Sequence, residues 1–318
     1  MFLLDTRYHS QLLSSFTKFS LSRNLYMAKI DELLKVSAPL AWQWAPQLCR
    51  KDPETGEDCS HNHGIWQYLR IMGLTGTIEP RRGFYLNAIQ TITGTGGAPR
   101  VLISGTADYA MLDFVITAFR LRGITPDITV TDLCETPLAL NRWYAEQASC
   151  HIKTIRCDIM DFETAVRFDA VCADYFLSKF PAARRGALLG KWHGLLRPGG
   201  AVITATRLRP ASEGATVSFL PEQVEKLRTA AARVAREMQA SLGVDPEAFA
   251  ERAAVFASKY ITHAVHTQEE VSALFEGCGF AVSHASIDHA PNVGTHGVSG
   301  PTMRGDAIHY LTVVAHRL

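Results

Sequence analysis

A chain of 318 residues with a formal net charge of +1 and 47% hydrophobic residues has the composition of a globular protein with a sizeable core, which excludes a disordered or fibrous chain. The near-neutral charge, without a Lys/Arg-rich stripe, argues against a nucleic-acid partner. No apolar run reaches the ~18 residues that a bilayer requires, and the first residues are interrupted by charges. We therefore expect a cytoplasmic protein with no membrane partner.

Helical patterns characterise residues 1–95, and they predict an N-terminal helical cap. The clearest pattern spans Leu25–Leu40, and a second amphipathic piece covers Gly64–Met72 after a polar, loop-like stretch from residue 42 to 62. The glycine-rich segment 93–99 resembles a phosphate loop, but it precedes a strand where a phosphate loop would follow one. We interpret it as a linker.

Strands and helices alternate after this linker. The pattern predicts strands at 101–104, 127–131, 152–156, 169–174 and 200–206, and helices at 109–121, 137–148 and 182–196. Such alternation is typical of a parallel sheet with helices on both faces. Next come amphipathic helices at 221–242 and 246–260, a helix at 267–277, and strands at about 280–287 and 307–315.

These elements predict one α/β fold for residues 96–318. We expect a Rossmann-like, doubly wound sheet of about seven strands, mostly parallel, with a helical lid insertion at about 211–262. The alternative role of the inserted helices is a dimerisation surface. The sequence is compatible with either a monomer or a homodimer.

Polar and small residues follow the predicted strands in a recognisable order. Gly105 ends the first strand and opens a tight turn. Asp132 ends the second strand about 27 residues later, where a carboxylate can accept hydrogen bonds from both hydroxyls of a ribose. Asp158 follows the third strand, and the fourth ends in a carboxylate and two aromatic rings, Asp174, Tyr175 and Phe176. Each signal is weak alone, and their order is what makes the set specific.

Taken together, these residues resemble the class I S-adenosylmethionine-dependent methyltransferases over roughly residues 97–207 and, in topology, over the closing strands. The resemblance implies S-adenosylmethionine as cofactor. Asp132 would hold its ribose, Leu133 would pack on the adenine ring, and Asp158 would bind the adenine amino group. The full set of residues that would contact the cofactor is Gly105, Thr106, Asp108, Asp132, Leu133, Asp158, Ile159 and Asp174.

The resemblance also places the fourth strand end near the reactive sulfonium. Asp174 and Tyr175 are the predicted catalytic residues, with Asp174 as a proton acceptor or orienting carboxylate. Tyr175 or Phe176 would face the sulfonium cation, a contact worth roughly 0.5 to 2 kcal/mol. Since the cap must cover the strand ends, we expect part of it to line the acceptor pocket. The predicted pocket residues are Tyr85, Trp66, Phe176 and His63.

The first turn departs from the family pattern. Ile103, Ala107 and Tyr109 stand where the family has an acidic residue and two further glycines. The acidic residue normally helps to hold the cofactor's α-ammonium. Either Asp108 or a cap residue supplies that contact, or the amino group is held less tightly.

Three functions follow from these patterns. The first is methyl transfer to an oxygen or nitrogen nucleophile of a small molecule, in specialised (secondary) metabolism. The second is cyclisation of the cofactor itself, in which its amino group attacks its γ-carbon to give azetidine-2-carboxylate and methylthioadenosine. The third is a cofactor-binding regulatory protein without catalysis. The acceptor's identity stays open, because no motif occurs in the cap or the lid.

The chain has seven cysteines, an odd number that favours reduced, mostly buried thiols over a disulfide framework. Cys49, Cys59, His61 and His63 offer zinc-ligand types but lack the usual Cys-x2–4-Cys spacing. Methyl transfer requires no metal, and none is assigned here. In the alternative interpretation these residues form a loop over the active site with His63 reaching the substrate, and metal binding is left open.

Overall fold

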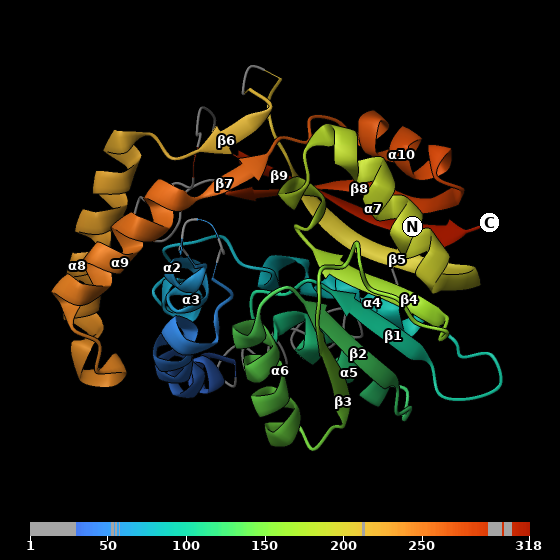
Figure 1. Ribbon diagram of the computed structural model, residues 1–318, viewed down its shortest axis with the longest axis horizontal. Coiled ribbons are helices and arrows are strands. Elements are labelled where there is room, and N and C mark those ends of the chain that lie inside the picture. The colour runs from blue at the N-terminus through green and yellow to red at the C-terminus, as the bar shows by residue number, and fades with distance from the viewer. Residues whose placement is uncertain are drawn as a thin grey trace, which may run out of the picture.

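The computed structural model describes residues 30–51, 54, 56, 58–211, 214–291, 301 and 307–318, with the backbone alone at 289–291, 307 and 308. Within these residues, seven strands form one sheet in the order β3-β2-β1-β4-β5-β9-β8 (Figure 1). The strands are β1 (Arg100–Ser104), β2 (Asp127–Asp132), β3 (Ile152–Arg156), β4 (Phe168–Asp174), β5 (Leu196–Leu208), β8 (Phe280–Pro291) and β9 (Ala307–Arg317). β1 to β5 pair in parallel, whereas β9 runs antiparallel to both β5 and β8. The predicted Rossmann-like, mostly parallel sheet is confirmed.

Helices cover both faces of this sheet. They are α4 (Arg82–Gln90), α5 (Ala110–Arg120), α6 (Glu135–Gln147), α7 (Ala182–Leu195) and α10 (Gln268–Gly277). Val101 and Ile103 of β1 pack in the apolar layer with α4, α5 and α6, while Leu102 packs in the opposite layer with α7 and α10. A strand covered on both faces needs consecutive apolar residues, which explains why residues 101–103 are all apolar.

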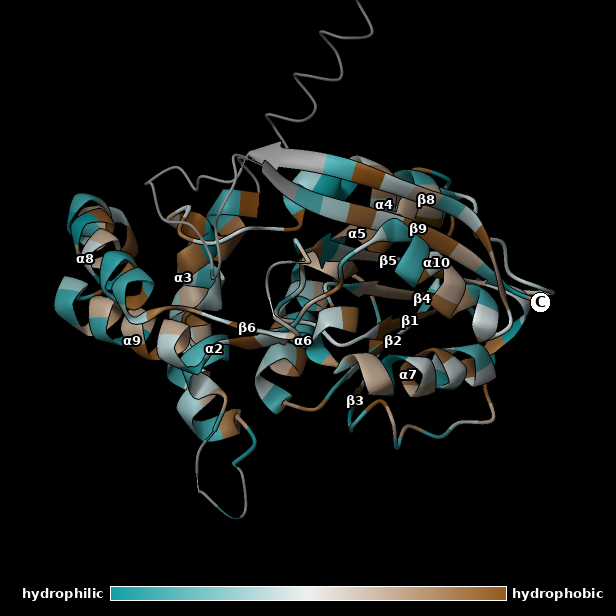
Figure 2. Cartoon of the chain, turned by 90° about the horizontal axis from the view of Figure 1, so that it is seen from above, coloured by the Kyte–Doolittle hydropathy of each residue, from teal (hydrophilic) through white to brown (hydrophobic). Residues whose placement is uncertain are grey.

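A third apolar core lies outside the sheet. Residues 30–48 are helical, and this helix packs with α3 (Trp66–Ile71) against the hairpin of α8 (Pro221–Leu242) and α9 (Pro246–Lys259). Figures 1 and 2 show α8 and α9 side by side, next to α3 and away from the sheet. The guanidinium of Arg252 lies 3.5 Å from the ring centroid of Trp42. Segments before β1 and after β5 therefore share one core.

Two short strands join the ends of this hairpin. β6 (Thr216–Ser218) and β7 (Ile261–His263) pair antiparallel, directly before α8 and after α9. These strands were not predicted, since three residues are too few for a period-2 pattern. No helix among the described residues combines the length and the apolar character needed to cross a membrane.

The N-terminal region differs from its prediction in one respect. The helix predicted to end at residue 40 runs on to residue 48, through Pro39 and Pro46, so the first part of the predicted loop at 42–62 is wrong. Its small residues Ala38, Ala41 and Ala45 are fully buried, and their packing stabilises the helix despite the hydrogen bond that Pro39 removes. Residues 25–29 of this prediction, like residues 1–24 of the predicted cap, lie outside the described residues.

Candidate functional site

The strand order reverses between β1 and β4, and ligands of open α/β sheets bind beyond the carboxyl ends of the strands at such a point. A cavity of about 190 Å³ lies there. It is lined by Gly105, Thr131, Asp132, Leu133, Cys157, Asp158, Ile159, Phe176, Lys179 and Phe180. The structure therefore brings five predicted cofactor residues together, namely Gly105, Asp132, Leu133, Asp158 and Ile159.

A larger hollow of about 540 Å³ lies between residues 162–167 and α7. Its lining includes residues directly before β4 and Leu195, directly before β5, so it sits near the amino ends of these strands. Because ligands of this sheet type bind at the carboxyl ends, the smaller cavity is the candidate site.

Gly105 forms the floor of the cavity next to Phe176. Its backbone has φ +72°, a conformation that favours glycine, and its N–H donates to the carbonyl of Thr131 over 2.9 Å. A Cβ at this position would overlap the ring of Phe176. Phe176 stacks in turn on Trp192, with ring centroids 6.1 Å apart. The glycine is required both for the turn and for the approach of the aromatic ring.

Backbone N–H groups from two loops hold the carboxylate of Asp132. Its Oδ2 accepts a hydrogen bond from the Thr106 N–H (2.9 Å) and its Oδ1 from the Cys134 N–H (2.8 Å). Burial raises the pKa of Asp132 above its ordinary value, although His63 and these two N–H groups act in the opposite direction. Each carboxylate oxygen keeps further acceptor capacity, which suits a ligand with two neighbouring hydroxyls. Thr106 thus reaches the site through its backbone.

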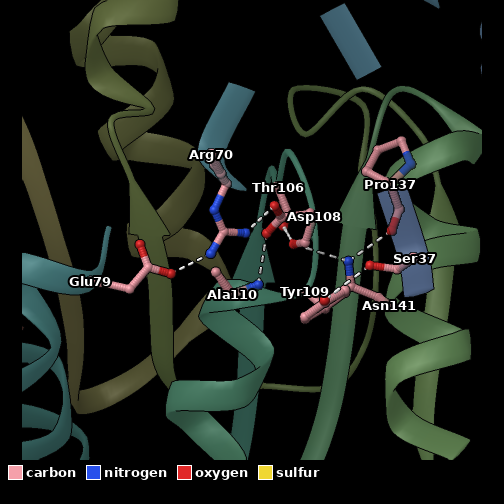
Figure 3. Close-up of polar contacts among 9 residues, drawn as sticks. All are labelled: Ser37, Arg70, Glu79, Thr106, Asp108, Tyr109, Ala110, Pro137 and Asn141. Atoms are coloured by element: carbon pink, nitrogen blue, oxygen red, sulfur yellow. Dashed lines mark hydrogen bonds and ion pairs between the residues drawn. The ribbon is translucent and has the colours of Figure 1, made fainter. Parts of the chain in front are cut away.

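Asp108 takes part in a buried ion-pair network instead of the cavity wall. Arg70, 7% exposed, pairs with both Asp108 and Glu79, as Figure 3 shows. The second carboxylate oxygen of Asp108 accepts from the Ala110 N–H (2.9 Å) at the start of α5. The predicted contact between Asp108 and the α-ammonium is therefore corrected: the carboxylate is 3% exposed and faces Arg70, because the first turn is anchored to α3.

Asp174 is bound on both carboxylate oxygens. Arg81 donates to Oδ2 (2.8 Å) and the Tyr85 hydroxyl to Oδ1 (2.7 Å). The guanidinium of Arg81 lies over the ring of Tyr310, 4.1 Å from its centroid. Burial raises the pKa of Tyr85 well above its ordinary value. Asp174, at the end of β4, and Tyr85, from α4, are thus bound to each other, and neither belongs to the residues that line the cavity.

One polar atom of this group is unsatisfied. Nη1 of Arg81 is buried without a hydrogen-bond partner among the residues that the structure describes. A buried guanidinium N–H that lacks a partner costs free energy unless a ligand binds it. Sequence analysis missed Arg81, because nothing in its local pattern distinguishes it from a surface arginine.

Tyr175 has an unusual backbone and an arginine partner. Its φ of +57° is rare for a residue other than glycine, and such local backbone strain clusters at functional sites. Its hydroxyl accepts a hydrogen bond from Arg209 (3.3 Å). Burial opposes ionisation, but Arg209, Arg207 and a hydrogen bond from Tyr260 outweigh it and lower the pKa of Tyr175. The pKa of Tyr260 is raised well above its ordinary value by burial and by Tyr175.

The predicted acceptor-pocket residues separate into different places. Phe176 lines the cavity. Trp66 packs on the helical core shared with α8 and α9, and His63 is buried beside Cys49, so neither belongs to the cavity. Lys179 and Phe180 were missed, although they follow Phe176 by three and four residues. Lys179 ends the short η2 helix (Leu177–Lys179) and Phe180 directly follows it, and this helix has too few residues to give a helical pattern.

All seven cysteines are free thiols in the structure. The expectation that most are buried is wrong, since only Cys49, Cys134 and Cys172 are, whereas the others lie in loops or at element ends. Cys49, Cys59 and His63 converge, and they meet Cys134, which lies between β2 and α6. His61 is turned away, with Nδ1 2.9 Å from the carbonyl oxygen of Asp58.

Comparisons with known proteins add the following. No family model and no curated protein matches the chain. Among solved structures, it is similar to 1,6-didemethyltoxoflavin-N1-methyltransferase of Burkholderia thailandensis, with bound 1,6-didemethyltoxoflavin and S-adenosylhomocysteine, at 13% identity and a TM-score of 0.48, covering 91% of this chain and 89% of that one. The N-methyltransferase NodS of Bradyrhizobium japonicum, bound to S-adenosyl-L-homocysteine, matches at 12% identity and 0.44, covering 80% and 98%.

A further similar structure is an S-adenosylmethionine-dependent methyltransferase of Methanosarcina mazei, at 13% identity and a TM-score of 0.43, covering 73% of this chain and 97% of that one. At these identities and TM-scores, the overlays say nothing about the substrate or the reaction. What the chain does must be inferred from its own residues.

Proposed function

We propose that this chain is an enzyme that binds S-adenosylmethionine in the cavity at the carboxyl ends of β1, β2 and β4. In its reaction the methyl group passes to an oxygen or nitrogen nucleophile of a small molecule of specialised metabolism. The observation that carries the proposal is the meeting of Gly105, Asp132 and Asp158 on one cavity. They follow three different strands and were singled out from the sequence for this cofactor.

The lining fits an adenosyl group chemically. Asp132, oriented by two backbone N–H groups, would accept hydrogen bonds from the ribose hydroxyls. Leu133 and Ile159 offer apolar surface for the adenine ring, and Asp158 a carboxylate for its amino group. Phe176 would present an aromatic ring to the sulfonium, a contact worth roughly 0.5 to 2 kcal/mol.

When bound, the cofactor would supply a methyl group on a positively charged sulfur. The nucleophile would attack the methyl carbon in line with the carbon–sulfur bond, and the sulfur would leave. The protein's part would be to hold the acceptor close and to exclude water, which can lower the barrier by about 7 to 11 kcal/mol. Tyr175 is the better proton acceptor of the two predicted catalytic residues, because Arg209 and Arg207 favour its phenolate. Asp174, bound to Arg81 and Tyr85, would orient the acceptor.

Cyclisation of the cofactor is a second candidate, and the Asp108 ion pair favours it. Ile103 stands where the family has an acidic residue and the Asp108 carboxylate faces Arg70, so neither position offers a carboxylate for the α-ammonium. Once the amine has lost a proton, its nitrogen attacks the γ-carbon while the bond from that carbon to sulfur breaks and its electron pair stays on sulfur. The products are azetidine-2-carboxylate, after loss of the nitrogen's extra proton, and methylthioadenosine.

One incubation separates these candidates. The chain is mixed with S-adenosylmethionine alone, and the products are identified by mass spectrometry, with Tyr175→Phe as the catalytic control. Turnover only after an acceptor is added, with S-adenosylhomocysteine as product, supports the transferase. Methylthioadenosine without an acceptor supports the cyclase. Binding without turnover over a broad acceptor panel would contradict both and favour a regulatory protein.

A further inference from the structure

Four metal-ligating side chains meet where the N-terminal helices contact the sheet. Cys49 follows the helix of residues 30–48, Cys59 and His63 flank or belong to α2 (Ser60–His63), and Cys134 precedes α6. Their sulfur and nitrogen atoms all lie within 4.8 Å of one another. These segments are up to 85 residues apart in the chain, from Cys49 to Cys134, so the convergence is a product of the fold.

The distances fit the ligands of a single tetrahedral ion. Cys49 Sγ lies 3.5 Å from His63 Nδ1, and Cys59 Sγ lies 3.4 Å from Cys134 Sγ. With metal bonds of ~2.3 Å to sulfur and ~2.0–2.1 Å to nitrogen, tetrahedral geometry separates the ligand atoms by roughly 3.5 to 3.8 Å. Only small movements would bring all four atoms to bonding distance of a common centre.

The surroundings are those of a mostly buried, sulfur-rich site. The exposed fractions of Cys49, Cys134 and His63 are 6%, 2% and 8%. The Thr136 hydroxyl lies 3.2 Å from Cys49 Sγ, and the Arg50 N–H donates to Cys134 Sγ over 3.4 Å. Hydrogen bonds to the sulfurs are typical of the groups that support thiolate ligands around a metal.

We propose that Cys49, Cys59, His63 and Cys134 bind a structural zinc ion. Three thiolates and one imidazole are a ligand set of structural zinc sites, and four protein ligands leave no position for water or substrate. This proposal departs from the sequence analysis, in which no residue was assigned to a metal and Cys134 was not considered. It does not depend on the proposed function.

Zinc at this place would connect the N-terminal helices to the ligand cavity. Cys134 lies two residues after Asp132, and its N–H donates to the Asp132 carboxylate. An ion that fixes Cys134 therefore also fixes the orientation of this cavity carboxylate. Its loss is expected to lower both the melting temperature and the affinity for adenosyl ligands, because metal binding contributes to folding free energy.

Elemental analysis of the full chain, prepared without a polyhistidine tag, tests the site directly. We expect one zinc ion per chain in the wild-type protein and loss of most of it in Cys59→Ser and Cys134→Ser. Cys278→Ser is the matched control, because this partly buried thiol lies outside the site and should leave the zinc content unchanged. A wild-type chain without stoichiometric metal, or a Cys134→Ser variant with full zinc content, would overturn the proposal.

A second measurement needs no folded variant. After chelation, the wild-type chain is titrated with Co²⁺, and we expect the visible bands of tetrahedral cobalt together with thiolate-to-metal charge transfer. Peptide mapping without reduction is done on the same preparation. An octahedral cobalt spectrum, or a disulfide between Cys59 and Cys134 in the freshly purified chain, would contradict the proposal.

Discussion

At the scale of single residues, Gly105 and Phe176 define the floor of the cavity. The turn needs a positive φ, and the ring of Phe176 occupies the space that a Cβ would fill. Gly105 and Phe176 therefore line the same part of the cavity. Gly105 follows β1 and Phe176 follows the neighbouring strand β4, so the ring can lie against the turn only because residue 105 has no side chain.

Gly105→Ala is accordingly expected to be costly. A left-handed φ for alanine costs roughly 1–2 kcal/mol, and the overlap with Phe176 adds roughly 1–3 kcal/mol. We expect a lower free energy of unfolding in urea and weaker binding of S-adenosylmethionine by calorimetry. Gly97→Ala is the control, since nothing lies within 4 Å of its Cβ position. Equal stability and affinity in the Gly105 variant would show that the turn is not restricted as described.

Tyr175 gives a prediction about pH. Because its pKa in the folded chain lies below the ordinary value of 10.0, the phenolate stabilises the folded state at alkaline pH. This contribution is lost as the pH falls through the lowered pKa. Ultraviolet titration should show one tyrosine that ionises early, and Tyr175→Phe should remove it and shift the pH profile of turnover.

Tyr68→Phe is the matched control for this titration. The pKa of Tyr68 is raised by burial, so its loss should leave the early phase intact. If the early phase survives in Tyr175→Phe, the arginine pair does not act on this phenol.

At the scale of elements, Arg70 joins α3 to the first turn and to η1 (Glu79–Arg81). It is buried and lies between Asp108 and Glu79. Burial alone would raise the pKa of Glu79, but Arg70 and the hydrogen bonds from the Thr77 side chain and a backbone N–H together outweigh it and lower that pKa. The turn that shapes the cavity is thus connected to the helices before the sheet by charge as well as by apolar contact.

Removing one member of this network leaves buried charge without a partner. We expect Arg70→Ala to lower the free energy of unfolding by roughly 3–5 kcal/mol, whereas replacing an exposed pair usually costs ~0–1 kcal/mol. Arg233→Ala, which breaks an exposed pair with Glu237 on α8, is the matched comparison. Urea unfolding of both variants measures the difference, and similar losses would mean that the buried network contributes no more than a surface pair.

At the scale of the whole molecule, the sheet and part of the site were predictable. Apolar runs and helical spacing gave the strands and helices, and β3 and α8 have their predicted bounds. Gly105, Asp132 and Asp158 were expected at one site and line one cavity, because parallel strands bring their carboxyl ends to one edge. Local sequence is enough to predict which residues lie together when the order of the strands alone determines their positions.

The remaining contacts depend on packing between distant segments. Arg70 meets Asp108 across 38 residues, Tyr175 meets Arg209 across 34, and Cys59 meets Cys134 across 75. No spacing rule covers such pairs, because helices 30–48, α3, α8 and α9 are placed by their shared apolar core. For this reason the position of Asp108, Trp66 and His63 outside the cavity lining could not be predicted from the sequence.

The central claim is that the cavity beside β1, β2 and β4 binds S-adenosylmethionine through Asp132. Calorimetric titration of the wild-type chain and of Asp132→Ala with S-adenosylmethionine tests it most directly, with Asp132→Asn as the conservative variant. We predict one site per wild-type chain and a loss of about 1 to 3 kcal/mol in Asp132→Ala, through the missing charge-assisted hydrogen bonds. An unchanged affinity in Asp132→Ala, or no binding by the wild-type chain, would contradict the claim.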